Sequence, residues 1–261
     1  MEAILKKVQV HIPFTMLREG YLDLFLKRRI NPEISFSAET LARHTTAEFA
    51  EMGTKLAAAG LTVTLHGPFM DLRPGAIDPE IRRVSRDRIA QAVTLSSLFH
   101  PKTIVCHPSF DHRYYVSTLD QWVANSVETW SYLAGLLDGE ETIICLENVY
   151  ERDPEPFRRL FAALASPRIG FCLDTGHFNC FSQTPLEEWL EALHPYLRQI
   201  HLHDNLGQAD QHLPVGDGTF PFRRLFALLR ESSIAPVLTV ESHREEDLPR
   251  FAANIEAMAL L

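Results

Sequence analysis

Short apolar segments alternate with longer amphipathic segments along the whole chain. Each apolar segment is rich in Val, Ile, Leu and Thr, and it shows too little polar alternation for a strand with one exposed face. Strands that are apolar on both faces are typical of a parallel sheet covered by helices. We therefore predict eight buried strands. They lie within residues 7–14, 33–39, 61–69, 103–109, 142–149, 169–177, 197–204 and 237–243.

The amphipathic segments between these strands have the apolar periodicity of helices that bury one face. Thr45 and Asp78 are typical residues at a helix start, and Gly60 is typical of a helix end. We therefore predict a helix after each strand. The eight helices lie within residues 16–28, 45–59, 79–99, 119–138, 155–165, 185–194, 221–231 and 245–260.

Eight strands alternating with eight helices predict an α/β protein with the (β/α)8 TIM barrel fold. An open, doubly wound sheet would alternate in the same way, but no strand is followed by a glycine-rich dinucleotide turn. The length of 261 residues suits one barrel. Because no Pro/Gly/Ser-rich linker and no internal repeat interrupts the pattern, we expect a single domain over residues 1–261.

Composition and charge limit the classes of partner. Hydrophobic residues make up 46% of the chain and charged residues 23%, which is an ordinary globular balance. The formal net charge of -9 argues against binding to nucleic acid or to an anionic membrane, because both depend on clustered Lys and Arg. No segment has the apolar length of a bilayer span, and the start of the chain lacks the apolar core of a secretory signal.

The cysteines indicate a reducing compartment. Their spacing forms neither a zinc motif nor a disulfide framework, and three of the four lie within predicted strands, where a thiol behaves as a small hydrophobe. We therefore expect a cytoplasmic protein. The four are Cys106, Cys145, Cys172 and Cys180.

Polar side chains that can bind metal ions stand at the ends of six consecutive predicted strands. The carboxyl ends of barrel strands meet on one face, so these side chains should share one site. No Lys or Arg stands at these strand ends, and the carboxylates would repel one another unless a divalent cation lay between them. Taken singly, each would be interpreted as a hydrogen-bonded rim residue. The six are His66, His107, Glu147, Asp174, His201 and Glu241.

Two local spacings add further candidate ligands. Asp174 and His177 are three residues apart across a predicted turn, and Asp210 and His212 are two apart in the loop after the seventh strand. His203 shares a strand face with His201, and spacing alone does not decide between them. Three other histidines have no such partners in sequence, so we assign them surface or core roles. They are His11, His112 and His243.

The motifs HGPF, CHPS, LEN, DTGH, HLHD, DQHLPVGDG and VES, in this order, resemble those of the xylose-isomerase-like TIM-barrel superfamily. That superfamily contains sugar and sugar-phosphate isomerases and epimerases, and also the endonuclease IV class of AP endonucleases. The resemblance covers nearly the whole chain. It implies an epimerase-type metal core on Glu147, Asp174, His201 and Glu241, with His201 rather than His203 as the ligand. It also implies that the nine-ligand zinc set of the endonucleases falls on those four together with His66, His107, His177, Asp210 and His212.

The resemblance implies an enzyme with one to three divalent ions, Zn²⁺ or Mn²⁺. We expect isomerisation or epimerisation of a small sugar or sugar phosphate through a metal-bound enediolate, with Glu147 and Glu241 exchanging the proton. The alternative is a multinuclear zinc phosphoesterase of the endonuclease IV type, against which the acidic composition argues if the substrate is DNA. A third hypothesis is a metal-binding protein without turnover. The sequences LENVYERD and Gly216-Asp217-Gly218 depart from the ketose 3-epimerase motifs and leave the substrate open.

Other residues are expected to contact the substrate rather than to carry the chemistry. The expected partner is a small sugar or sugar phosphate, and a homo-oligomer is compatible with the sequence. Met70, Phe14 and Phe110 follow strands and could line the same pocket, although apolar packing is their default role. The substrate-binding candidates are His177, His203, Phe69 and Asn148.

Overall fold

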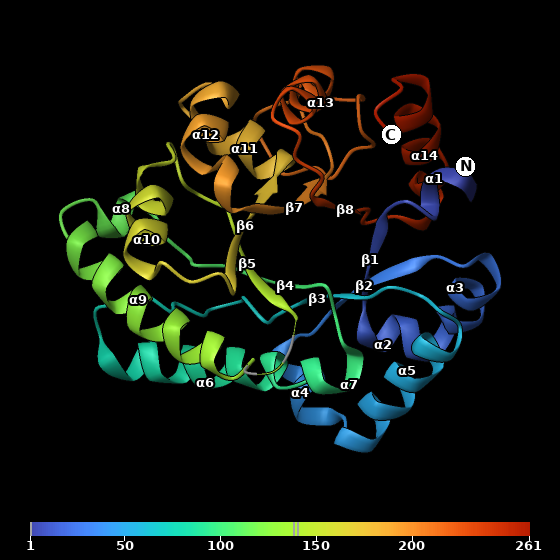
Figure 1. Cartoon of the computed structure of the whole chain (residues 1–261), viewed down its shortest axis with the longest axis horizontal. Helices are drawn as coiled ribbons and strands as arrows, with labels where there is room; N and C mark the ends of the chain where they lie inside the picture. The colour runs from blue at the N-terminus through green and yellow to red at the C-terminus, as the bar shows by residue number, and fades with distance from the viewer. Residues whose placement is uncertain (1, 138, 140) are drawn as a thin grey trace.

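Eight parallel strands close into a barrel in sequential order from β1 to β8, which confirms the predicted TIM barrel. The computed structural model describes residues 2–137, 139 and 141–261. Figure 1 shows the strands around the centre of the molecule with the helices outside them. The strands are β1 (Gln9–Pro13), β2 (Asn31–Ser35), β3 (Thr64–His66), β4 (Thr103–Cys106), β5 (Ile143–Glu147), β6 (Ile169–Asp174), β7 (Leu197–Leu202) and β8 (Val237–Val240).

The helices follow the predicted alternation, with short additions in the loops. The main helices are α3 (Leu22–Arg28), α5 (Thr46–Ala58), α6 (Pro79–Val93), α9 (Leu119–Gly135), α10 (Glu155–Leu164), α12 (Leu186–Leu193), α13 (Phe222–Glu231) and α14 (Leu248–Ala257). The shorter ones are α1 (Glu2–Leu5), α2 (Phe14–Met16), α4 (Ala38–Arg43), α7 (Ser96–Phe99), α8 (His112–Tyr115) and α11 (Thr175–Phe181). A π turn, η1 (Leu17–Tyr21), and two 3-10 turns, η2 (His194–Tyr196) and η3 (Glu245–Asp247), complete the set.

The start signals act as predicted. The Thr45 side chain accepts from the backbone N–H of Glu48, whose carboxylate accepts in return from Thr45, so α5 begins with a capping box. Asp78 accepts from two N–H groups at the start of α6. Gly60 takes a positive φ of 65° after α5.

Three predicted segments differ in detail. The helix predicted over 79–99 breaks between α6 and α7, and the one predicted over 16–28 contains the π turn η1. The strand predicted over 33–39 ends at Ser35, because Ser37 caps the short helix α4 with its hydroxyl on the Thr40 N–H. The predicted end of the helix over 119–138 falls on residue 138, which lies outside the described residues.

A polar layer crosses the barrel interior below the carboxyl ends of the strands. Glu33 Oε2 accepts from the Thr64 hydroxyl at 2.9 Å, from the Thr239 hydroxyl at 3.0 Å and from the Gln199 amide. The Gln199 carbonyl oxygen in turn accepts from the Thr103 hydroxyl. We call these five residues the lower polar layer. It forms the floor on which the next inward-facing residues of the same strands stand.

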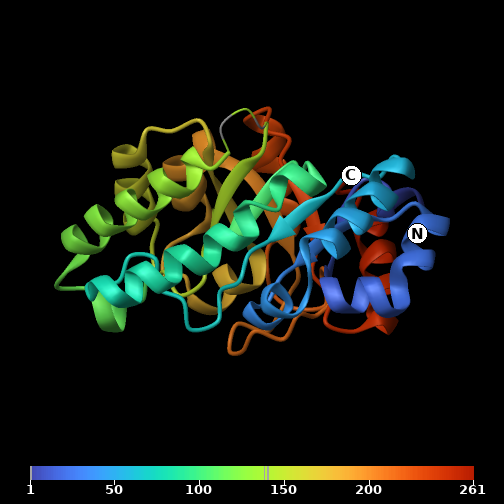
Figure 2. The ribbon, with the colours of Figure 1, turned by 90° about the horizontal axis from the view of Figure 1, so that it is seen from below.

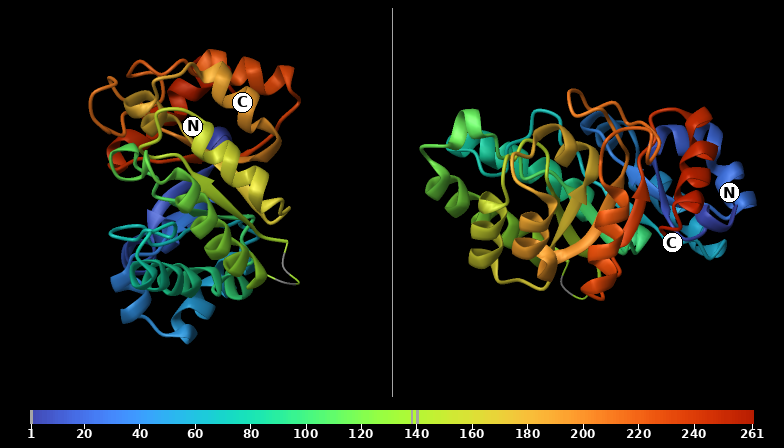
Figure 3. Two further views of the ribbon diagram at one scale, coloured as in Figure 1. Left: turned by 90° about the vertical axis from the view of Figure 1, so that its left-hand side faces the viewer. Right: turned by 90° about the horizontal axis from the view of Figure 1, so that it is seen from above.

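The barrel closes between its first and last strands, and the chain ends lie near this closure. Two residue pairs join β1 to β8, whereas five join β1 to β2. Helix α1 packs on α14, and the two termini lie close together in every view (Figures 1, 2 and 3). Among the described residues, no helix combines the length and the apolar character needed to span a bilayer.

Candidate metal centre

The six strand-end residues lie together at one end of the barrel. His66, Glu147 and Asp174 are the last residues of β3, β5 and β6. His201 is the penultimate residue of β7, and Glu241 follows β8 directly. The sixth residue, His107, follows β4 directly, and its Nε2 lies 3.2 Å from Glu147 Oε2. All but His107 are buried, so the polar atoms of this site face one another rather than bulk water.

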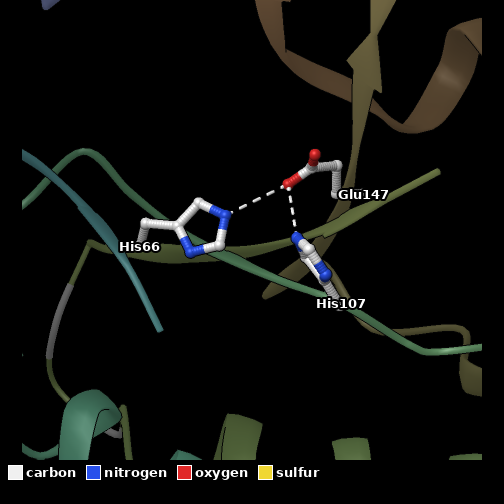
Figure 4. A group of neighbouring side chains, drawn as sticks. All are labelled: His66, His107 and Glu147. Carbon is white, nitrogen blue, oxygen red and sulfur yellow. Dashed lines mark hydrogen bonds and ion pairs between the residues drawn. The ribbon is translucent and has the colours of Figure 1, made fainter. Parts of the chain in front are cut away.

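The first donor group consists of His66, His107 and Glu147 (Figure 4). The Nε2 atoms of His66 and His107 each lie 3.2 Å from the same oxygen, Glu147 Oε2. His66 Nδ1 lies 2.8 Å from the Gly67 carbonyl oxygen, to which it donates, so its Nε2 is the nitrogen free for a ligand. The Phe69 ring stacks on His107 with a centroid distance of 4.5 Å and fixes that imidazole from the outside.

The second donor group surrounds one nitrogen of His201. Its Nδ1 lies 3.3 Å from Glu241 Oε2, 3.6 Å from Asp174 Oδ2 and 3.7 Å from Glu147 Oε1. Its Nε2 lies 3.0 Å from Glu33 Oε1 in the lower polar layer. A buried carboxylate therefore faces Nε2 of this imidazole, while Nδ1 is directed at three carboxylate oxygens.

The third donor group comes from β7, its following loop and the end of β8. His203, His212 and Glu241 have ligand atoms within 4.8 Å of one another. The rings of His203 and His212 stack in parallel at 3.9 Å, and Asp210 Oδ2 lies 3.0 Å from His212 Nε2. His203 Nε2 also lies 2.8 Å from Asp174 Oδ2, which connects this group to the second.

His177 links the groups from the first turn of α11. Its Nδ1 lies 3.2 Å from Glu147 Oε1 and 3.3 Å from Asp174 Oδ1, and its Nε2 lies 3.4 Å from Asp210 Oδ2. Asp174 also caps α11 by accepting from the backbone N–H of His177 at 2.6 Å. The turn predicted between these two residues is therefore the start of a helix, which holds both side chains toward the centre.

The loop that carries Asp210 and His212 is organised by Asp204. The Asp204 carboxylate accepts from the backbone N–H groups of Gly216 at 3.0 Å, Gly218 at 2.9 Å and Phe220 at 3.1 Å. A Cβ on Gly218 would meet the Asn205 carbonyl oxygen at 2.2 Å, so only glycine fits there. These bonds between the Asp204 carboxylate and backbone N–H groups fix the conformation of the loop.

The arrangement fits divalent cations. His201 Nδ1, His203 Nδ1 and Glu241 Oε2 are buried and have no hydrogen-bond partner among the described residues. Buried polar atoms are almost always paired, and two of these, His201 Nδ1 and Glu241 Oε2, lie 3.3 Å apart beside carboxylate oxygens of Asp174 and Glu147. Imidazole and carboxylate together suit zinc, and carboxylate also suits manganese.

Electrostatic coupling within the site is strong. Burial alone would raise the pKa of Glu147, but the surrounding histidines, His107 and His201 first, hold it well below its usual value. Burial alone would lower the pKa of His177 and His201, but the nearby acidic groups raise both well above their usual values. Protons therefore occupy positions on these imidazoles that a cation would have to displace.

The structure adds residues that the sequence does not single out. Glu33 lies in a predicted strand that ends in no motif, and only the closure of the barrel brings it to His201. His243 stacks on His212 at 3.5 Å and lines the cavity over the site, and the His11 ring lies 6.1 Å from that of His66. The surface or core roles assigned to His243 and His11 are therefore incomplete. His112 packs against Phe110, in line with its assigned role.

Asn148 does not lie where a substrate contact requires. Its amide nitrogen donates to the Asp174 carbonyl oxygen at 3.0 Å, and its amide oxygen accepts from the Asp174 N–H at 2.8 Å. It is buried and does not line the cavity. The geometry therefore does not support the predicted substrate contact, because both polar atoms of the side chain hold the backbone of Asp174. His203 is likewise buried beneath His212.

A cavity of about 420 Å³ opens above the donor groups. Phe69, Met70 and Tyr150 form its apolar rim, and Arg73 supplies a cationic side chain that also lies 4.8 Å from the Tyr114 ring. Phe14 and Phe110 are buried in packing contacts, as their default role predicts. The size suits a small molecule or one unit of a larger one.

Comparison with known proteins identifies the family of the chain. The profile of the family described as "Xylose isomerase-like TIM barrel" matches residues 33–261. The chain belongs to this family. The family assignment covers most of the barrel, including every donor residue described above.

Relatives and structural neighbours of the chain carry different names. The chain is 27% identical over 234 residues to "Probable endonuclease 4" of Mycoplasma pneumoniae, covering 77% of this chain and 75% of that protein. It is similar in fold to the TTHB071 protein from Thermus thermophilus soaked with ZnCl2, with a TM-score of 0.80, 23% identity and coverage of 97% and 98%. A D-tagatose 3-epimerase-like protein gives a TM-score of 0.78 at 18% identity, with 97% of both chains covered.

Proposed function

We propose that this family member is a multinuclear metal-dependent phosphoesterase that acts on a small-molecule phosphoester. The observation that carries the proposal is the position of Glu147 between two donor groups. Its Oε2 faces His66 and His107, while its Oε1 faces His177 and His201. A carboxylate shared in this way would serve as a ligand in both donor groups, and two divalent cations held there would supply the chemistry of phosphoester hydrolysis.

Each donor group has a role in this proposal. His66, His107 and Glu147 would hold one ion, and Glu147, Asp174, His201 and Glu241 a second. His212 of the third donor group, together with the neighbouring His177 and Asp210, would hold a third, within the one to three Zn²⁺ or Mn²⁺ ions expected from the sequence. When bound, such ions supply a nucleophile from water at neutral pH and stabilise charge on the phosphoryl oxygens. The reaction adds water across a P–O ester bond and releases an alcohol and a phosphate with one fewer ester bond.

The chain's other residues define the substrate's size. Phe69, Met70 and Tyr150 at the rim offer apolar contact and shield the centre from water. Arg73 would contact a phosphate oxygen or another anionic group away from the centre. The net charge of -9 gives no general attraction for a nucleic acid duplex, so a small substrate is favoured over DNA. We also propose a cytoplasmic location and a single domain over residues 1–261.

A sugar isomerase or epimerase is the second candidate. Glu147 and Glu241 approach His201 Nδ1 from different strands, so they would flank a small polyol bound there. The similarity in fold to a D-tagatose 3-epimerase-like protein agrees with this candidate. It requires that Glu147 be free to accept a proton, which the contacts of His66 and His107 with the same carboxylate oppose.

Substitution of the first donor group distinguishes the two candidates. His66→Ala and His107→Ala would be nearly as damaging as Glu147→Gln in a multinuclear hydrolase, and much milder in an isomerase that uses only the second group. The measurements are hydrolysis of bis(p-nitrophenyl) phosphate and deuterium wash-in on ketoses and ketose phosphates. Cleavage of an abasic-site duplex is measured beside them. Wash-in without any hydrolysis would contradict the phosphoesterase proposal and support the isomerase.

The content of bound ions provides a test that does not depend on the substrate. Protein purified without added metal and then equilibrated with Zn²⁺ should bind more than one ion per chain, and His66→Ala should lower that number. The matched control is His112→Ala, whose side chain lies against Phe110 outside the donor groups. One ion per chain, unchanged by His66→Ala, would favour the isomerase.

A further inference from the structure

A second cavity, of about 280 Å³, lies beside the metal centre where the barrel closes. β1 pairs with β8 only through Gln9 with Thr239 and Val10 with Val240. Beyond these pairs, residues 11–13 line one side of the cavity and residues 242–244 line the other. We call it the seam cavity. The cavity extends from this seam toward the helices α3 and α14.

The seam cavity adjoins the cavity over the donor groups. His243 lines both cavities, and its ring stacks on the candidate ligand His212 with a centroid distance of 3.5 Å. His11 lines the seam cavity, and its ring lies 6.1 Å from the ring of His66. His243 is thus a wall shared by the two cavities, and a substituent of a molecule bound at the donor groups would pass this side chain to reach the seam cavity.

Apart from His11 and His243, the polar side chains around the seam cavity are hydrogen-bonded within the protein. The Tyr21 hydroxyl donates to Glu245 Oε2 at 2.7 Å, and the Ser242 hydroxyl donates to the Arg244 carbonyl oxygen at 2.7 Å. The Arg244 guanidinium donates to Glu246 Oε1 at 2.6 and 2.9 Å. Polar ligand groups would have to compete with these bonds. What remains is an apolar wall of Ile12, Met16, Leu24, Phe25 and Leu248.

The outer wall has an adaptable shape. Met16 is 47% exposed although it lines the cavity, and the π turn η1 that follows it ends at Tyr21, whose hydroxyl closes the edge on Glu245. π turns inside helices occur frequently at functional sites, and an unbranched methionine adapts to the shape of a ligand. These features distinguish the wall from ordinary core packing.

We propose that the seam cavity binds an apolar, ring-sized group of the substrate whose phosphoester lies at the donor groups. This proposal rests on the proposed function and adds the chemical class of the substrate: a phosphoester with an aromatic or alicyclic substituent. The occupant is part of the substrate itself, because the cavity adjoins the metal centre through His243 and offers few unpaired polar groups.

Non-hydrolysable phosphonates test the proposal by binding alone. The probes are methylphosphonate and a series of phenylalkylphosphonates with linkers of different length, titrated calorimetrically into zinc-loaded protein. At the best linker length we expect the phenyl probe to bind about tenfold more tightly than methylphosphonate. Met16→Trp fills the cavity and should remove this preference while leaving the affinity for methylphosphonate unchanged.

The control places the same substitution on an equally exposed residue elsewhere. Ile81→Trp on α6 is suitable, because Ile81 is also 47% exposed and lines neither cavity. It should keep the tenfold preference. If Met16→Trp does not fold, Leu24→Ala replaces it and should weaken the phenyl preference at least about threefold.

The outcomes separate the two proposals. Equal affinity for all probes in the wild type, failure of every phosphonate to bind, or a phenyl preference that persists in Met16→Trp would overturn the seam cavity as a substrate site. Failure of the proposed function shows itself differently: phosphodiesters are not hydrolysed although the phenyl preference is present and depends on Met16.

Discussion

Two polar layers lie one above the other inside the same barrel, and they differ in how their atoms are paired. In the lower polar layer, Glu33 Oε2 accepts three hydrogen bonds from side chains of the layer itself. In the layer of donor groups above it, His201 Nδ1 and Glu241 Oε2 are equally buried but have no hydrogen-bond partner among the described residues. The two layers are built by the same barrel strands.

The difference separates structural polarity from polarity that serves a ligand. A buried network that satisfies its own members makes the core rigid and specific, whereas unpaired atoms directed at one centre destabilise the protein until a ligand pairs them. Glu33 belongs to both cases, because its Oε1 is also buried without a hydrogen-bond partner among the described residues and lies 3.0 Å from His201 Nε2. The lower polar layer therefore supports the donor groups rather than duplicating them.

Removing the shared carboxylate should have the largest effect. Glu147→Ala takes a ligand from two donor groups at once, so we expect phosphodiester hydrolysis to fall by at least roughly 1,000-fold. The measurements are the hydrolysis rate and the zinc content after equilibration. The matched control is Glu151→Gln in the loop that follows β5, which should keep its zinc. Unchanged zinc content in Glu147→Ala would contradict the assignment of Glu147 as a shared ligand.

A change in the lower polar layer should act on the ion indirectly. Glu33→Gln keeps the shape of the side chain but removes the charge that orients His201, so zinc affinity should fall about 10- to 100-fold. Chelator competition measures this. Thr103→Val is the comparison within the same layer: it leaves the Gln199 oxygen without its donor and should lower the free energy of unfolding by about 1–3 kcal/mol without changing zinc affinity. Equal affinities in wild type and Glu33→Gln would disprove the link.

Glu151 provides a pH-dependent contrast. Burial raises its pKa to about 8, although its carboxylate accepts from the Val149 N–H at 2.7 Å. A carboxyl whose pKa is raised by folding contributes stability at low pH and loses it as the pH rises through the folded value. In zinc-free protein, Glu151→Gln should therefore gain stability relative to wild type from pH 5 to pH 8, by a few kcal/mol. Denaturant unfolding at several pH values measures the difference, and a constant difference would refute it.

The smallest effect should come from a residue outside both layers. Thr45→Ala removes the side-chain cap of α5 and should lower the free energy of unfolding by about 1 kcal/mol. Zinc affinity and hydrolysis rate should not change. A loss of zinc in this variant would mean that ion binding reports general stability rather than the geometry of the donor groups.

Residues at strand ends could be predicted from the sequence, because a barrel places the carboxyl ends of all its strands on one face. Once eight parallel strands are assigned, His66 and Glu241 must share one end although they lie 175 positions apart in the sequence. Glu33 could not be found in this way. Its contact with His201 depends on the stagger of β2 relative to β7, which lie apart in the sheet order.

Side-chain direction is the other quantity that the sequence does not supply. Asn148 follows Glu147 directly, yet the alternation of a strand turns it away from the cavity and toward the backbone of Asp174. His243 follows the last strand without a motif of its own, and its place above His212 results from the path of the loop after β8. Local pattern identifies which residues carry polar atoms, whereas the tertiary path decides where those atoms point.

Two residue pairs join β1 to β8 and close the barrel, so bound ions would add to the stability of the closed form. Glu147 is on β5 and Glu241 follows β8, so an ion held by both joins distant parts of the ring. Opening of β8 away from β1 would release that ion, and any ligand that binds only the closed form shifts the equilibrium toward it. We therefore expect the amide hydrogens of β8 to exchange with solvent more slowly once zinc is added, with a smaller change in β3 and β4.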